Sequence, residues 1–437
     1  MTIDDPAVLL RTLFDAAVAA ADPRTVLAAH LPEPPRGRCV VVGGGKAAAA
    51  MAQAVEAAWP AVALSGAVAV PEGQTLFCRR IEVIEAAHPR PDERSERAGR
   101  RMLELVSGLG ADDLVLALVS GGGSSLLSVP APGLVLADKQ ALTRDLLRSG
   151  ATIAEMNLVR RQLSAIKGGR LARAAAPARV ETLLVSDIPG DDPGDIASGP
   201  TVDGRGNAAE ALAILRRHRV EPPAAVRALL ENAAAATSSP LSLPAPRLIA
   251  TPMMSLRAAA DAARARGVVP MVLGDALEGE SRQLGLMLAG IARSVREHGA
   301  PLPAPCVLLS GGETTVTIGA GPAGRGGRNT EALLGFALAA PPGCWALMAD
   351  TDGIDGDSDA AGAIASPDGL ARAAALGLDA RAILDGHDSY RLFDALDTLL
   401  RTGPTHTNVN DFRAVFVGEA PGASPIRGPQ ARRRLVS

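Results

Sequence analysis

The sequence predicts an α/β fold in two domains. Short apolar runs of strand length alternate with helical patterns along the whole chain, which is typical of α/β proteins. The runs show almost no alternation of polar and apolar residues, as expected for strands that helices cover on both faces. A length of 437 residues allows two or three domains that each bury a core. Each domain is therefore predicted to be an α/β/α layered, Rossmann-like unit with a mostly parallel sheet.

The expected elements follow from these patterns in chain order. The strand-like runs lie at 39–42, 66–70, 114–119, 182–185, 268–273, 306–309, 345–348 and 414–417. Helical patterns lie between them, at 47–58, 93–107, 208–219, 256–266, 281–298 and 329–339.

A stretch at 236–246 separates the two predicted domains. It is rich in Ser, Thr and Pro and has no periodicity, so it predicts a linker or a long surface loop. The N-terminal domain is accordingly predicted at 1–240 and the C-terminal domain at 247–420. The Arg-rich segment 421–437 is predicted to be a flexible, solvated tail.

Composition excludes several classes of protein. A net charge of -3 and only nine aromatic residues argue against nucleic-acid binding. The sequence contains no run of about 18 apolar residues, so no membrane span is predicted. The acidic start at 1–5 lacks the basic region of a signal peptide. The four cysteines are far apart and form no CxxC pair. We therefore expect a cytoplasmic protein without disulfides, either a monomer or a homodimer.

Lysine is rare in this chain. Lys46, Lys139 and Lys167 are the three lysines, so 41 of the 44 basic residues are arginine. A coding bias explains the excess of arginine, and each remaining lysine therefore deserves a specific explanation. Lys139 has none and is expected at the surface.

The first glycine-rich loop, Gly43–Lys46, follows the first predicted strand and opens a helix. Gly44 and Gly45 would let the backbone approach a ligand, and a helix N-terminus favours an anion. Lys46 is electrostatically unfavourable there unless an anion compensates it. A tight turn without ligand is the alternative. The spacing also matches a dinucleotide-binding fingerprint, although Glu72 is a poor ribose-binding residue.

Four further segments are candidates for ligand binding. A strand leads into Ser120, Gly121, Gly122, Gly123, Ser124 and Ser125, which would form a nest for phosphate oxygens or a simple flexible turn. Gly311, Gly312 and Glu313 form a similar loop, in which the carboxylate could hold a lysine or a metal-bound water. Arg328 lies between glycines and a helix start. Asn157, Arg160 and Lys167 belong to a polar segment that could grip a carboxylate or phosphate, or be a solvated face.

Two acidic turns suit a hard cation. The first contains Asp187 and Asp191, and the second contains Asp350, Asp352, Asp355 and Asp357. Mg²⁺ is typically held by one or two carboxylates and the phosphates of a nucleotide, whereas helix capping is the ordinary alternative. Which turn holds the metal stays open. Anion recognition combined with a hard cation is what phosphoryl transfer needs.

Nine motifs in order along the chain resemble the class II glycerate kinases, a family whose C-terminal part is called the MOFRL domain. They are VVVGGGKA (40–47), HPRPDERS (88–95), LVSGGGSSLL (118–127), NLVRRQLSAIKGGRLA (157–172), VSDIPGDDPGDIASGPT (185–201), LLSGGET (308–314), GGRNTEALLGFA (326–337), DTDGIDGDSDAAGA (350–363) and GPTHTNVND (403–411). The resemblance covers nearly the whole chain.

The resemblance implies a two-domain enzyme with its active site in the interdomain cleft. It would convert D-glycerate and ATP to 2-phosphoglycerate with Mg²⁺. Lys46 and Arg328 fall on the family's catalytic cations, Ser120 to Ser124 on its phosphate loop, and Asp187 and Asp191 on its acidic turn. Two alternatives remain: an NAD(P)H-dependent hydroxypyruvate reductase, since some relatives carry that label, and a non-enzymatic protein that binds a phosphorylated metabolite.

Overall fold

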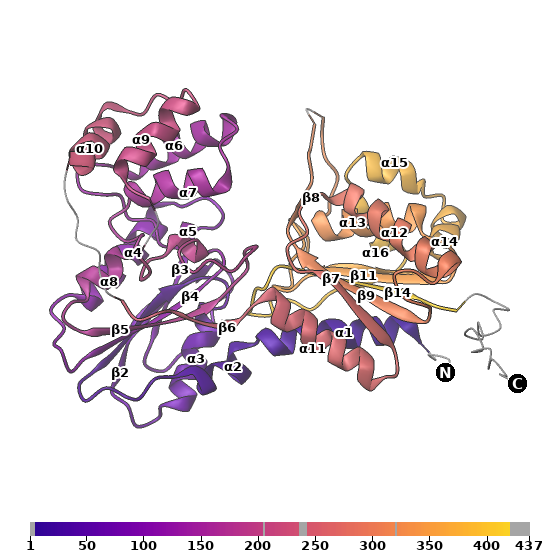
Figure 1. Ribbon diagram of the computed structural model, residues 1–437, viewed down its shortest axis with the longest axis horizontal. Coiled ribbons are helices and arrows are strands. Elements are labelled where there is room, and N and C mark those ends of the chain that lie inside the picture. The colour runs from indigo at the N-terminus through magenta and orange to yellow at the C-terminus, as the bar shows by residue number, and fades with distance from the viewer. Residues whose placement is uncertain (1–4, 204–205, 236–242, 320, 420–437) are drawn as a thin grey trace, which may run out of the picture.

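The computed structural model describes residues 5–203, 206–235, 243–319 and 321–419. Two α/β lobes lie side by side (Figure 1), which confirms the predicted fold class. Most of the predicted linker at 236–246 and the whole predicted tail at 421–437 lie outside the described residues.

The first lobe contains a six-stranded parallel sheet in the order β3-β2-β1-β4-β5-β6. Its strands are β1 (Cys39–Gly44), β2 (Leu64–Pro71), β3 (Glu82–Ala86), β4 (Leu114–Ser120), β5 (Arg179–Val185) and β6 (Arg247–Ala250). This is the strand order of doubly wound dinucleotide-binding sheets, in which the order reverses between β1 and β4. Ligands bind at that reversal, beyond the carboxyl ends of the strands.

Helices cover both faces of this sheet. The elements α2 (Pro23–Val26), η1 (Leu27–His30) and α3 (Ala48–Ala58) pack on one face, and α4 (Glu93–Val106) and α8 (Arg170–Ala174) on the other. Cys39 and Val41 face the first layer, whereas Val40 and Val42 face the second. Because both sides of β1 are buried, its sequence is an unbroken apolar run.

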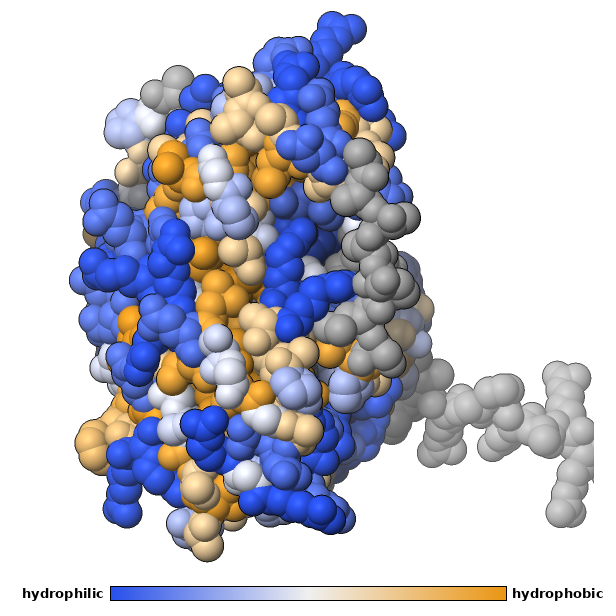
Figure 2. Space-filling view, turned by 90° about the vertical axis from the view of Figure 1, so that its left-hand side faces the viewer, coloured by the Kyte–Doolittle hydropathy of each residue, from blue (hydrophilic) through white to orange (hydrophobic). Residues whose placement is uncertain are grey.

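A helical layer with its own small core extends this lobe beyond the sheet (Figure 1). It contains α6 (Leu136–Arg148), α7 (Ile153–Gln162), α9 (Ala208–Arg217) and α10 (Ala224–Ala235). The short elements α5 (Gly123–Leu126) and η2 (Ile196–Ser198) lie between this layer and the strands. Figure 2 shows the side of the molecule that this lobe presents, on which apolar residues form a band between hydrophilic margins.

The second lobe contains a mixed sheet in the order β13-β12-β11-β14-β9-β7. Its strands are β7 (Val269–Gly274), β9 (Cys306–Gly312), β11 (Cys344–Asp350), β12 (Gly362–Ala365), β13 (Leu399–Leu400) and β14 (Asp411–Val417). The β7–β9 pair is parallel and the other four pairs are antiparallel. The expectation of a mostly parallel sheet is therefore wrong for this lobe, because β14 runs antiparallel between β9 and β11, and β12 runs antiparallel between β11 and β13.

Helices also cover both faces of the second sheet. On one face lie α12 (Ser281–His298), α13 (Arg328–Ala339), α14 (Gly369–Ala375), α15 (Ala380–Asp385) and α16 (Ser389–Ala395). On the other lie α1 (Pro6–Ala21) and α11 (Pro252–Ala265). A two-stranded pair, β8 (Gly279–Glu280) with β10 (Thr314–Thr315), completes the lobe.

The first helix of the chain belongs to the second lobe. Phe14 on α1 stacks edge-on against Phe412 on β14, with ring centroids 5.8 Å apart, and both side chains are buried. The Ser255 hydroxyl on α11 donates to the Ala17 carbonyl at 2.8 Å. At the other predicted boundary, β6 completes the first sheet by pairing with β5. The packing of α1 and β6 thus differs from the predicted division at 1–240 and 247–420.

Two further features agree with the composition. Among the described residues, no helix is long and apolar enough to cross a membrane. Cys39, Cys78, Cys306 and Cys344 are free thiols, and three of them are buried.

Candidate active site

A cavity of about 810 Å³ lies between the two lobes. The first lobe contributes Lys46 and Gly122, which follow β1 and β4 at the reversal of strand order. The second lobe contributes Asp350 at the end of β11 and Glu313 just after β9. The cavity therefore occupies the carboxyl ends of strands from both sheets, where α/β proteins bind ligands.

The antiparallel direction of β14 gathers the acidic residues of the second lobe. Asp411, at the start of β14, pairs with Asp350 on one side and with Gly312 on the other. The beginning of β14 therefore lies beside the ends of its two neighbours. Asp350, Asp411 and Glu313 come together at one edge of the sheet for this reason.

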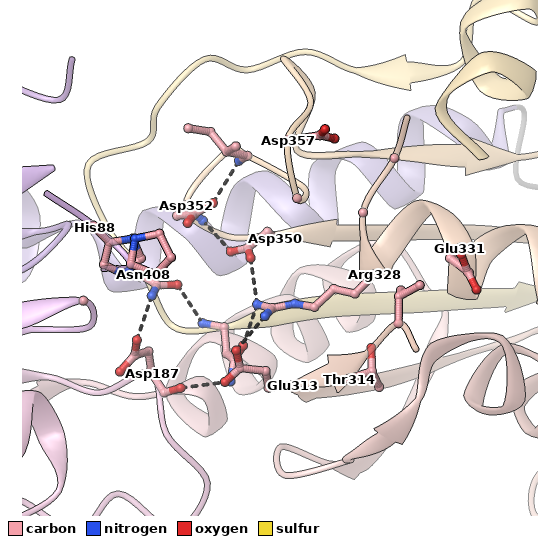
Figure 3. Close-up of a pocket in the computed structure, with 18 of the residues that line it drawn as sticks. His88, Asp187, Glu313, Thr314, Arg328, Glu331, Asp350, Asp352, Asp357 and Asn408 are labelled. Carbon is pink, nitrogen blue, oxygen red and sulfur yellow. Dashed lines mark hydrogen bonds and ion pairs between the residues drawn. The ribbon is translucent and has the colours of Figure 1, made fainter. Parts of the chain in front are cut away.

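Arg328 joins these three carboxylates. Its guanidinium donates from Nε to Asp411 at 2.7 Å, from Nη1 to Glu313 at 2.6 Å and from Nη2 to Asp350 at 2.8 Å. A fourth hydrogen bond, also from Nη2, reaches the Asn410 side chain at 3.0 Å. Figure 3 shows the guanidinium between Asp350 and Glu313. An arginine has five N–H donors, so among the described residues Arg328 keeps one Nη1 donor for a ligand.

The carboxylates determine the ionisation of Arg328. Burial alone would lower its pKa, but the charges of Asp411 and Asp350 reverse this effect and raise the pKa above the ordinary value. The pKa of Asp350 is also raised, well above the usual range, by its own burial and by the neighbouring Asp352. For a carboxylic acid this shift disfavours the charged form, whereas for Arg328 it favours the charged form.

Lys46 forms an ion pair across the interface between the lobes. Its Nζ lies 2.5 Å from Oδ2 of Asp352, and both side chains are largely shielded from solvent. Burial would lower the pKa of Lys46, yet the charges of Asp352 and Asp350 raise it overall. Lys46 therefore carries a permanent positive charge inside the cavity.

Asp187 is the second link between the lobes. The side-chain amide of Asn408 donates to its carboxylate at 2.9 Å (Figure 3), and that of Asn410 donates to its backbone carbonyl at 2.9 Å. Burial raises the pKa of Asp187 to about 6, although the charge of Lys46 opposes this shift. A half-buried carboxylate that faces the cavity is a suitable ligand for a hard cation.

His88 lines the same cavity and is uncharged. Burial lowers its pKa to about 4, and the positive charge of Lys46 contributes to the shift. The imidazole can therefore exchange hydrogen bonds with a ligand without adding charge.

The glycine-rich loops pack against one another more than they line the cavity. A Cβ on Gly121 would lie 1.8 Å from the Asp187 carboxylate, and one on Gly45 would lie 2.1 Å from the Ser120 hydroxyl. Gly122 faces the cavity and adopts a left-handed backbone with a φ of 80°. The other predicted loop residues lie behind the cavity wall: Gly44, Ser120, Gly123, Ser124, Ser125, Gly311 and Gly312.

Some of these buried loop residues fix the position of Lys46. The Ser120 hydroxyl accepts a hydrogen bond from the backbone N–H of Ala47 at 3.0 Å, next to the start of α3. The backbone N–H of Lys46 donates to the Gly121 carbonyl at 2.9 Å. The loops after β1 and β4 therefore act as one rigid support.

The acidic turns divide between binding and structural roles. Asp355 accepts hydrogen bonds from the backbone N–H groups of Asn329 and Thr330, both at 2.9 Å, and thus holds the start of α13. Asp191 lies outside the cavity lining. Its pKa is raised by burial and by the charge of Asp275, while a hydrogen bond with Ser186 lowers it. Of the predicted metal pair, Asp187 alone faces the cavity.

The predicted substrate contacts lie elsewhere. Arg160 donates to the Ser124 hydroxyl at 3.0 Å, and Lys167 donates to the Ser124 carbonyl at 2.6 Å. Asn157 accepts a hydrogen bond from Arg160 at 3.3 Å. Arg160 and Lys167 line a second cavity of about 710 Å³ in the first lobe.

Sequence reasoning missed several polar residues around the site. Asn408, Asn410 and Asp411 occur in the TNVND segment, whose density of amide and acid groups was the available signal. Lys139 was expected at the surface, but its side chain is buried and lines the second cavity.

The charge of the interlobe cavity suits a divalent cation. Two cations, Lys46 and Arg328, line it together with six carboxylates: Asp187, Glu313, Glu331, Asp350, Asp352 and Asp357. No group of three or more His, Cys, Asp or Glu side chains within the described ranges could hold a metal by itself. This combination fits Mg²⁺, which keeps several waters and binds one or two carboxylates together with phosphates.

Comparison with known proteins identifies the family. A model described as a domain of unknown function (DUF4147) matches residues 9–231, and the MOFRL family matches residues 306–411. The crystal structure of glycerate kinase from Thermotoga maritima superposes with a TM-score of 0.85 and 35% identity, covering 94% of this chain and 99% of that one. A D-glycerate 2-kinase of the same organism is 37% identical over 90% of this chain and 94% of its own length.

The chain belongs to the class II glycerate kinase family.

Other relatives show how the family's members are named. The human glycerate kinase is 35% identical over 93% of this chain and 92% of its own length. A protein of Agrobacterium vitis, provisionally named a hydroxypyruvate reductase, is 55% identical over 94% of both chains. Members of the glycerate kinase family thus carry the names of two different activities.

Proposed function

We propose that the chain transfers the γ-phosphoryl group of ATP to the 2-hydroxyl of D-glycerate, giving 2-phospho-D-glycerate and ADP. The observation that carries this proposal is the cavity in which Lys46 of one lobe and Arg328 of the other face the same space. Positive groups placed around a transferring phosphoryl group are the main requirement for its catalysis. Membership of the glycerate kinase family supports the choice of acceptor.

In this proposal Lys46 stabilises the transferring group. Two contacts fix its position: the backbone N–H of Lys46 donates to the Gly121 carbonyl, and its Nζ lies 2.5 Å from the Asp352 carboxylate. A phosphoryl oxygen would bind the Lys46 ammonium beside Asp352, or it would displace Asp352 from the ammonium. Because the charge is already oriented, little reorganisation is required as the reaction proceeds.

Arg328 has a different part in the proposal. Four of its hydrogen bonds hold Asp411, Glu313, Asp350 and Asn410 in place. Its remaining Nη1 donor can bind one oxygen of the substrate or the phosphate. Arg328 thus both organises the acidic wall and contributes a single contact to the ligand.

Asp187 is the residue that we expect to hold Mg²⁺, with the carboxylates of the second lobe close by. When bound, the ion would neutralise phosphate charge and orient the phosphates. Asn408 and Asn410 orient Asp187 from the opposite lobe. Closure of the lobes would then exclude water from the donor, as in other kinases with a cleft.

Phosphorus NMR of the product tests the proposal. Incubation with ATP, D-glycerate and Mg²⁺ is expected to give the signal of 2-phosphoglycerate and to release ADP. Formation of 3-phosphoglycerate would contradict the assigned position, and failure to release ADP would contradict the kinase activity.

The name of the Agrobacterium vitis relative favours one alternative, NAD(P)H-dependent reduction of hydroxypyruvate. The glycines of the β1–α3 turn face protein rather than open space, since a Cβ on Gly43 would lie 1.9 Å from the Leu118 carbonyl. Glu72 is paired with Arg94 at 2.9 Å. Both observations disfavour a dinucleotide. Steady loss of NADH absorbance with hydroxypyruvate would support the reductase and weigh against our proposal.

A further inference from the structure

The second cavity has the opposite charge to the first. It lies among α6, α7 and the segment 89–91, and its volume is about 710 Å³. Six cations line it: Arg90, Lys139, Arg144, Arg148, Arg160 and Lys167. Its described lining includes no carboxylate. We refer to it as the basic cavity and to the interlobe cavity as the acidic cavity.

Two of the cations are deeply buried. The Lys139 residue is 7% exposed and Lys167 is 1% exposed. Lys139 donates to the Ser128 hydroxyl at 3.1 Å and to the Val129 carbonyl at 3.3 Å. Lys167 donates to the carbonyl and hydroxyl of Ser124. These partners are all neutral, so they do not compensate a positive charge, and burial lowers the pKa of Lys167 well below its ordinary value.

The described residues offer these cations no counter-charge at ion-pair distance. Burial lowers the pKa of Lys139 to about 7, with a further contribution from Arg160, and only Glu96 opposes the shift. Glu96 itself is paired with Arg100 at 2.6 Å. A buried charge is costly unless an opposite charge accompanies it, so a bound anion would satisfy this cluster.

The remainder of the lining is uncharged, and more than half of its residues are apolar. Pro89, Pro91, Met156 and Leu147 line the cavity beside the cations. Leu147 is 64% exposed, which is unusual for a large apolar side chain next to a pocket. A lining that combines cations with apolar side chains suits a ligand with an apolar part and a negatively charged part.

The two cavities adjoin each other. Pro89 lines both of them. Lys167 in the basic cavity holds Ser124, and Gly122, two residues earlier in the same loop, faces the acidic cavity. An extended ligand can therefore lie in the basic cavity and reach past this loop toward Lys46.

We propose that the basic cavity binds the nucleoside triphosphate, with its base against the apolar side chains and its phosphate chain against Lys139, Arg160 and Lys167. The identity of the nucleotide as phosphoryl donor rests on the function proposed above. A small hydroxy acid with one negative charge would neutralise little of the cluster and leave most of the volume unfilled. A triphosphate carries enough charge to balance Lys139, Arg160 and Lys167, and its terminal phosphate would point to Lys46.

Isothermal titration calorimetry with the non-hydrolysable imido analogue of ATP tests this assignment without turnover. Lys139→Gln is expected to raise the dissociation constant at least tenfold. Arg144→Gln, at an exposed position of the same cavity, is expected to raise it about threefold and cannot disturb the core. Arg264→Gln serves as the matched control, because this exposed arginine lies on α11 in the other lobe and, among the described residues, pairs with Asp261 alone.

The outcomes separate this inference from the proposed function. Unchanged analogue binding in folded Lys139→Gln and Arg144→Gln would overturn the assignment, even if the protein is an active kinase. Weaker binding of D-glycerate with unchanged binding of the analogue would assign the cavity to the acid and overturn it as well. The variants could also lose analogue binding while the unsubstituted protein makes no phosphoglycerate. That result would support the nucleotide site and contradict only the kinase proposal.

Discussion

The acidic and basic cavities share a wall but satisfy their charges in different ways. In the acidic cavity, Lys46 and Arg328 each contact carboxylates of the chain at 2.5 to 2.8 Å. In the basic cavity, Lys139 and Lys167 contact only neutral oxygens. The acidic cavity is thus electrostatically organised before any ligand arrives, whereas the basic cavity depends on a ligand for its balance.

This difference predicts opposite responses to the loss of a cation. Removing a paired buried charge leaves its partners uncompensated and destabilises the fold. Removing an unpaired one relieves a desolvation cost. The following experiments would sharpen or break the comparison.

The largest effect is expected for Lys46→Ala. Loss of a positioned cation at the transferring group should lower kcat by about 1000-fold. Coupled measurement of ADP release with saturating D-glycerate and ATP checks this value, and circular dichroism confirms the fold. An activity within tenfold of the parent protein would exclude Lys46 from catalysis.

Arg328→Met should mainly reduce stability. The free energy of unfolding is expected to fall by about 3 kcal/mol, since Asp350 would lose its ion-pair partner and Asp411 would keep only Arg413. Urea unfolding followed by fluorescence measures the change. Arg325→Met is the control: this arginine is exposed, pairs with Asp359 at 3.1 Å and should change stability by less than about 1 kcal/mol. Equal effects of the two variants would contradict the comparison.

Lys139→Met should have the opposite sign. Methionine fills a similar volume without a charge, so the free energy of unfolding of the ligand-free protein should rise by about 1 kcal/mol at pH 7. The same urea titration measures it. A clear loss of stability would mean that the basic cavity is internally balanced after all.

The smallest effect concerns pH. The folded-state pKa of Lys139 is lowered to about 7, whereas the unfolded chain keeps the ordinary value near 10.4. Between these values the unfolded state binds more protons, so the parent protein gains stability as pH rises from 7 toward 10. The advantage of Lys139→Met should therefore shrink as pH rises from 7 to 9. Thermal melting of both proteins at each pH tests this trend.

The four central strands of the first sheet, β1, β2, β4 and β5, could be predicted because both of their faces are largely buried. The edge strands β3 and β6 were not among the predicted runs, and β3 is mostly exposed or half-buried. Runs such as 114–119 are wholly apolar, and their helices follow with little ambiguity. The topology of the second sheet was harder to predict, because an apolar run shows where a strand lies but not the direction in which it runs. The run at 414–417 was identified, while its antiparallel course, which brings Asp411 to the site, was not.

The site residues were predictable where glycine and charge occur together. Lys46, Arg328 and Glu313 each adjoin glycines, and all three line the acidic cavity. Asn408 and Asn410 lack that context, and their positions depend on how the two lobes meet. Lys139 was misplaced because its neighbours in the sequence, Asp138 and Gln140, are polar, so the local pattern suggested an exposed face.

The packing of α1 on the second lobe has a consequence for biosynthesis. The ribosome makes α1 first, but its partner strand β14 emerges almost four hundred residues later. Until then, the apolar side chains of α1, among them Leu10 and Phe14, can contact α11 but lack the completed sheet face that buries them. The first lobe can fold during translation, while α1 can be fully buried only after β14 has been made. A nascent chain halted before β14 would therefore expose that segment to chaperones and proteases.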